Sequence, residues 1–77
     1  MNTNNAMRTV VRESGLSMRR VSELMGRSSS WLGATLQRPG SSEAATVARL
    51  ASVCGYKLAL VPRDSVPDSA IVIDPGE

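Results

Sequence analysis

The amino-acid sequence predicts a mostly α-helical fold: one domain of four or five helices, followed by a pair of β-strands. Three observations carry this prediction. Apolar residues recur at helical spacing in four segments between residues 4 and 54, and a glycine or a proline follows each segment. Two of these segments are joined only by the short stretch "GRS" (26–28). After Gly55 the apolar pattern changes to short runs that favour β-structure.

The first two helices are predicted over residues 4–14 and from Met18 to Gly26. Ser, Thr and Asn favour the N-cap position, because their side chains accept a hydrogen bond from a free backbone N–H. We therefore expect Thr3 or Asn4 to cap the first helix and Ser17 to cap the second. The apolar faces follow the helical period: Met7, Val10 and Val11 in the first helix, and Met18, Val21, Leu24 and Met25 in the second.

The third helix is predicted to run from its N-cap, Ser28, to about Gln37, because Pro39 disfavours helical backbone at the residue before it. The fourth helix is predicted to begin at a Ser41 or Ser42 cap and to end at Gly55. Its inward side is expected to consist of four apolar residues: Val47, Leu50, Ala51 and Cys54.

The C-terminal segment is predicted to contain two strands, "YKLALV" (56–61) and "AIVI" (70–73), so that residues 1–55 form the helical domain and residues 56–77 an appendage. Both strands would carry apolar groups on both faces, which one small helical layer cannot cover. We therefore expect a homodimer interface here, formed by Tyr56, Leu58, Leu60, Ile71 and Ile73. A ribbon that folds against its own helices is the alternative.

Charge is distributed unevenly along the chain. Residues 1–57 hold eight basic and three acidic residues, a net +5, whereas residues 58–77 hold one basic and four acidic residues, a net −3. Eight of the nine basic residues are arginine, which binds phosphate and guanine better than lysine does. The first part of the chain therefore suits a polyanionic partner.

Several function classes find no support in the composition. One cysteine and no histidine exclude an intramolecular disulfide and a Cys/His zinc site. The sequence offers no Ser or Cys nucleophile with an evident general base, and no glycine-rich phosphate loop. We therefore expect neither an enzyme nor a cofactor, and no small-molecule ligand is evident. Without an apolar signal core or a membrane-length apolar run, we expect no membrane association and a cytoplasmic location.

Residues 7–56 resemble the Cro and lambda-repressor type of helix-turn-helix domain, also called the xenobiotic-response-element family. The resemblance rests on three stretches in the family's order: "RESGLSMRRVSELMG" (12–26), "RSSSWLGATLQR" (27–38) and "TVARLASVCGY" (46–56). It implies four or five helices, binding of double-stranded DNA by the third helix and a two-fold dimer. The exposed start of the third helix departs from the family, because it carries short side chains where long polar ones are usual.

The resemblance implies a set of candidate DNA-binding residues. Arg19 and Arg20 would hold phosphate at the start of the second helix, Arg27 would reach a phosphate or a guanine, and Arg38 would touch the backbone. Trp31 is also expected to be partly buried in the core. The whole set comprises Arg19, Arg20, Arg27, Ser28, Ser29, Ser30, Trp31, Gly33, Ala34 and Arg38. Arg8 and Arg12 are expected to be solvated charges.

The sequence thus predicts a sequence-preferring transcriptional regulator that binds double-stranded DNA, a small homodimeric repressor that controls its own operon. The alternative is a protein-binding module, such as an antitoxin that neutralises a partner protein. The alternative draws on the short side chains at the start of the third helix, Ser29 and Ser30, because serine discriminates poorly among bases.

Overall fold

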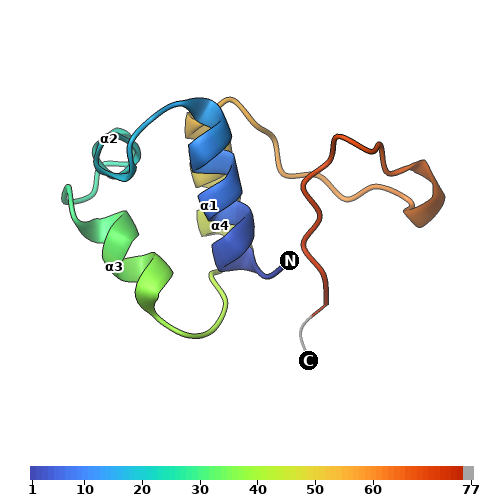
Figure 1. Cartoon of the computed structure of the whole chain (residues 1–77), viewed down its shortest axis with the longest axis horizontal. Coiled ribbons are helices and arrows are strands. Elements are labelled where there is room, and N and C mark those ends of the chain that lie inside the picture. The colour runs from blue at the N-terminus through green and yellow to red at the C-terminus, as the bar shows by residue number, and fades with distance from the viewer. Residues whose placement is uncertain (76–77) are drawn as a thin grey trace.

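The computed structural model describes residues 1–75 and contains four α-helices (Figure 1). Their bounds are α1 Thr3–Ser14, α2 Met18–Leu24, α3 Trp31–Gln37 and α4 Ala44–Val53, and a short 3₁₀-helix, η1, covers Arg63–Ser65. The helices α1 and α4 lie against each other, with α2 and α3 on one side of them. The chain after α4 leaves on the other side and returns toward α1 (Figure 1). The four expected helices are therefore present.

The core lies where the apolar faces of the four helices meet. Most of the residues expected to point inward do so, and Val21, Leu32 and Leu50 are fully buried. The buried cluster consists of Met7, Val10, Val11, Val21, Leu32, Leu36, Val47, Leu50 and Cys54. The prediction that Met18 and Leu24 of α2 face the core is wrong. Both side chains are exposed, because α2 has only seven residues and contacts its neighbours along one narrow strip.

The helix caps agree only in part with the predicted ones. The Ser17 Oγ accepts a hydrogen bond from the Arg20 N–H (3.0 Å), which confirms the cap of α2. Asn2, rather than Thr3 or Asn4, caps α1. The predicted serine cap of α4 is wrong, because α4 begins at Ala44 after Glu43, whose side chain makes no cap hydrogen bond. The nearby serine is engaged differently: the N–H of Ser42 donates to the Thr3 Oγ1 (3.1 Å).

The predicted β-strands are absent from residues 1–75, so the C-terminal two-stranded appendage is a wrong prediction. Residues 56–61 and 70–73 are extended but exchange no backbone hydrogen bonds. The N–H groups near the ends of these segments bind elsewhere: Tyr56 donates to the Ala51 carbonyl (2.7 Å) and Ala70 to the Pro67 carbonyl (3.0 Å). A ribbon of only two strands gains too little to draw these groups away.

The two segments of the tail (residues 56–75) do not pair with each other; instead, the end of the tail is hydrogen-bonded to the N-terminus of the chain. The Asp74 N–H donates to the Met1 carbonyl (2.9 Å), and the Met1 amino group pairs with the Asp74 carboxylate. An apolar cavity of about 270 Å³ remains beneath the tail, lined by Met7, Val10 and Leu50 of the core and by Ile71. The tail therefore covers α1 and α4 loosely. The last two residues of the predicted appendage, 76 and 77, lie outside the described residues.

Candidate nucleic-acid interface

The turn between α2 and α3 depends on Gly26. Its φ of 73° lies in the left-handed region, which glycine adopts without steric cost. The turn is closed by two backbone hydrogen bonds of 2.9 Å, from Gly26 N–H to the Glu23 carbonyl and from Arg27 N–H to the Ser22 carbonyl. The chain thus reverses within a few residues, and α2 and α3 pack directly on each other.

Ser22 ties the start of α3 to the middle of α2. It is fully buried, and its Oγ accepts a hydrogen bond from the Leu32 N–H (3.0 Å) while donating to the Met18 carbonyl (2.9 Å). The amide of Leu32 belongs to the first turn of α3, where backbone N–H groups have no partner within the helix. Ser22 is therefore both small enough for the close approach and a substitute cap for α3. The sequence indicates only the first of these roles.

The other end of α3 is held by two side chains of α1. The Arg8 Nη2 donates a hydrogen bond to the Leu36 carbonyl (2.8 Å), and the Asn4 Nδ2 donates to the Arg38 carbonyl (3.0 Å). The Leu36 carbonyl lies in the last turn of α3, where a cation is also favoured by the helix dipole, and the Arg38 carbonyl lies at the C-cap. The expectation that Arg8 is only a solvated charge is therefore wrong. Hydrogen bonds from neighbouring helices position α3 at both ends.

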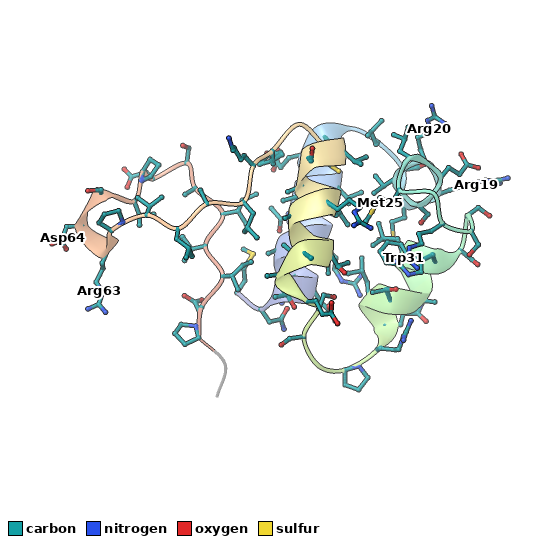
Figure 2. The ribbon with its side chains drawn as sticks, turned by 180° about the vertical axis from the view of Figure 1, so that it is seen from behind. Arg19, Arg20, Met25, Trp31, Arg63 and Asp64 are labelled. Atoms are coloured by element: carbon teal, nitrogen blue, oxygen red, sulfur yellow. The ribbon has the colours of Figure 1, made fainter. Side chains whose placement is uncertain are left out.

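Arg19 and Arg20 lie in the first turn of α2 and point away from the body of the molecule (Figure 2). Both are exposed, and each has a nitrogen 3.7 Å from an oxygen of Glu23. Exposed ion pairs at this distance contribute little to stability. A phosphate can therefore compete for both guanidinium groups, as the predicted phosphate contact requires.

The three serines precede α3 rather than occupying its first turn. Ser28, Ser29 and Ser30 are exposed, and α3 begins at Trp31. The predicted side-chain cap at Ser28 is wrong, since its backbone carbonyl, not its hydroxyl, accepts the Trp31 N–H (3.0 Å). The helix begins at Trp31 after its N-cap, Ser30, so Ser28 lies two residues before the cap position. The Leu32 amide, which a side chain at the N-cap would serve, is bonded to the Ser22 Oγ instead. The exposed hydroxyls remain available to an external partner.

Trp31 is half-buried and packs against the core, as expected. Figure 2 shows it at the start of α3, on the side that faces α4. The guanidinium carbon of Arg27 lies 5.2 Å from the centroid of its ring, within the range of a cation–π interaction. Trp31 therefore holds Arg27 in place and connects it to the core. Of the other predicted contacts, Ala34 is exposed on α3 and Gly33 is half-buried.

Arg38 and the predicted dimer residues complete the set. Arg38 is exposed at the C-cap of α3, so that exposed arginines flank this helix at both ends.

In the tail, Leu60 is fully exposed and Ile71 is half-buried against the core. Tyr56, Leu58 and Ile73 are each exposed by 36–40%. The structure thus places these five side chains along one tail, but not on paired strands.

Cys54, the one free cysteine, is buried in the core. Burial raises the pKa of the Cys54 thiol, and a hydrogen bond with Ser14 lowers it to a lesser extent. The thiol is therefore protonated near neutral pH and behaves as a small apolar residue. Within residues 1–75 no three His, Cys, Asp or Glu side chains cluster as metal ligands would.

Comparisons of the chain with protein-family models, with curated proteins and with solved structures gave no match. None of the helices in residues 1–75 combines the length and the apolar character needed to cross a membrane. The α2–α3 pair and the exposed arginines around it are therefore the features that can indicate a function.

Proposed function

We propose that this protein binds duplex DNA through the α2–α3 pair, as a helix-turn-helix, and represses transcription as a small homodimer. The observation that carries the proposal is the position of α3. It is a short helix tied to α2 by Ser22 and to α1 by Arg8, with exposed arginines at both ends. A helix fixed in this way can enter a major groove while the arginines hold the flanking phosphates.

The side chains on the exposed part of α3 determine how such a protein reads DNA. Ser29 and Ser30, just before α3, and Ala34 on the helix are short, so the backbone at the start of α3 can approach the base edges closely. A serine hydroxyl bonds to several bases and discriminates among them weakly. Affinity then comes mainly from phosphate contacts, and the sequence preference is modest. The proposed location is the cytoplasm, as expected from the sequence.

A homodimer supplies the second α3 that a two-fold operator needs, about 34 Å from the first. Exposed apolar side chains of the tail support an interface there, above all Leu60. The interface does not depend on strands within one chain. Two copies that cover each other's tails would remove these side chains from water.

The test is binding to the DNA upstream of the protein's own gene, compared with an unrelated duplex of equal length. If each subunit places about three arginines on phosphates, log affinity falls against log salt with a slope of about −5. Fluorescence anisotropy at several salt concentrations measures both quantities. Equal affinity for the two duplexes would exclude an operator in that region, and an affinity independent of salt would exclude phosphate-dominated binding.

The second candidate is a protein-binding module that neutralises a partner, and the exposed apolar tail favours it. Leu60 is fully exposed in the single chain, and Val61 is 45% exposed. Co-expression with the product of the adjacent gene distinguishes the two functions. A stoichiometric complex that forms through the tail, together with no preference for the upstream duplex, would favour the module.

A further inference from the structure

The apolar cavity of about 270 Å³ beneath the tail lies on the side of α1 and α4 opposite to α2 and α3 (Figure 1). Its inner wall is the core itself, with the fully buried side chains of Met7 and Leu50. Its outer wall is the tail, with Leu58 and Ile71. Protein interiors are close-packed and contain few voids larger than a water molecule. A cavity of this size beside a small core therefore has room for a ligand.

The lining of the cavity favours an apolar occupant. All of its residues are apolar except Tyr56, Lys57 and Ser69. Water in a cavity needs several polar partners, and an apolar cavity stays dry and takes up apolar molecules instead. Known ligand pockets have the same character, with apolar walls and a few polar groups that orient the ligand.

Charge indicates how such an occupant is oriented. Lys57 is the one charged residue of the lining, and within residues 1–75 its ammonium group pairs with no carboxylate. Its side chain is exposed, and a lysine stem can follow apolar surface while its ammonium group stays in water. No acidic residue of the described chain lines the cavity. The edge of the cavity at Lys57 therefore suits an anionic group.

The volume limits the size of the ligand. An apolar cavity of about 150 Å³ takes up benzene, so in proportion a cavity of 270 Å³ holds about ten non-hydrogen atoms. Octanoate has this number of atoms, whereas a phospholipid with two long chains is far too large.

We propose that the cavity binds a small amphipathic anion, an alkyl carboxylate the size of octanoate, with its chain against Met7 and Leu50 and its carboxylate beside Lys57. The proposal goes beyond DNA binding and does not depend on it. Leu58, Ile71 and Ile73 belong both to this lining and to the predicted dimer residues. A second copy is therefore the competing occupant.

Titration with octanoate, below the concentration at which it forms micelles, tests the proposal, and 1-octanol is the uncharged counterpart. Calorimetry should show saturable binding of one octanoate per chain and weaker binding of octanol. Nuclear magnetic resonance should show chemical-shift changes at the methyl groups of Met7 and Ile71, on the two walls of the cavity.

Two pairs of matched variants locate the ligand. Ala70→Leu fills part of the cavity and should weaken octanoate binding about fivefold, whereas Ala45→Leu makes the same change at an exposed position outside the lining and should not. Lys57→Gln should weaken octanoate binding about threefold and leave octanol binding unchanged. Arg63→Gln removes an equal charge from the tail, outside the lining, and should leave both unchanged. Thermal unfolding checks that all four variants are folded.

Several results would overturn the proposal. Octanoate binding that does not saturate, or that Ala70→Leu and Ala45→Leu weaken equally, would remove the ligand from the cavity. Octanol binding as tight as octanoate binding, or an equal loss in Lys57→Gln and Arg63→Gln, would exclude a carboxylate held by Lys57. If octanoate binding weakens as the protein self-associates at higher concentration, a second copy fills the cavity instead.

Discussion

The α2–α3 end and the tail of this molecule differ in how many of their backbone polar groups find hydrogen-bond partners within the chain. At the α2–α3 end, the turn at Gly26, the cap at Ser17 and the contact of Ser22 with α3 use residues within about ten positions of one another. In the tail, residues 57–61 lie in a predicted strand but donate no backbone hydrogen bond to another part of the described chain. The α2–α3 end is therefore complete within one chain, and the tail is not.

The comparison shows which interactions decide local structure. Helices form from bonds between near neighbours, and one buried face is enough to hold them. Strands need partners that are distant in sequence, and here the only intramolecular partner is a second short segment beyond Pro62 and Pro67. The tail therefore carries apolar residues that no sheet buries. In the proposed dimer, a second copy would supply the missing partner.

The largest effect should separate two leucines of these two regions. Leu50 is fully buried in α4, and Leu60 is fully exposed in the tail. Leu50→Ala should lower the free energy of unfolding by about 2–5 kcal/mol, because it leaves a cavity in a small core. Leu60→Ala should leave the unfolding of the monomer unchanged.

Chemical denaturation at low protein concentration measures both leucine variants. A large loss of stability for Leu60→Ala would mean that the tail packs tightly and would remove the contrast. Sedimentation at high concentration adds a second readout. Leu60→Ala should weaken self-association if the tail forms the dimer interface, whereas an unchanged dimer would place that interface elsewhere.

The next effect concerns two serines on either side of the turn. Ser22→Ala should destabilise the protein by about 1–3 kcal/mol, because the buried Leu32 N–H loses its acceptor. Ser28→Ala, which removes an exposed hydroxyl without a cap role, should change stability little. Thermal unfolding compares the two variants. Equal effects would show that the start of α3 does not depend on α2.

Much of the helical part could be predicted from the sequence, for a physical reason. Gly26 and Ser17 act through local backbone geometry, and the period of Met7, Val10 and Val11 marks a buried face without knowledge of what covers it. The strands were mispredicted because β-propensity describes a preference for a pleated surface, which only a partner can supply. The serine cap of α3 was mispredicted because α3 begins two residues later than expected, after Ser30, and the Ser22 Oγ bonds the Leu32 amide. The serine cap of α4 was mispredicted because α4 begins after Glu43, while the Ser42 amide is bonded to Thr3 of α1.

In the candidate site too, some features were predictable from the sequence and others were not. The exposure of Arg19 and Arg38 follows from their places at helix ends and was predictable. The role of Arg8 was not, because it donates to a carbonyl 28 residues away, and no local pattern records that contact. Arg27 and Thr46, which line the same hollow between α3 and the start of α4, likewise come together only when the chain folds. Long-range polar contacts are thus the part of the site that requires the structure.

The smallest effect tests whether α3 depends on α1 for its position. Arg8→Ala removes the hydrogen bond to the Leu36 carbonyl and should cost about 1 kcal/mol of stability. Arg12→Ala removes the same charge from an exposed position of α1, where no hydrogen bond of its side chain is seen in residues 1–75, and should cost less. Thermal unfolding measures this difference.

DNA binding makes the comparison of the two arginines sharper. Arg8 acts through α3 and not on phosphate, so Arg8→Ala should weaken binding through a displaced helix while the slope of log affinity against log salt stays at its wild-type value. Arg12→Ala should leave both quantities nearly unchanged. A shallower slope for Arg8→Ala, with unaltered stability, would instead make Arg8 a phosphate contact. In that case Asn4 would be the remaining side chain of α1 that holds the end of α3, and the position of α3 would depend mainly on Ser22 of α2.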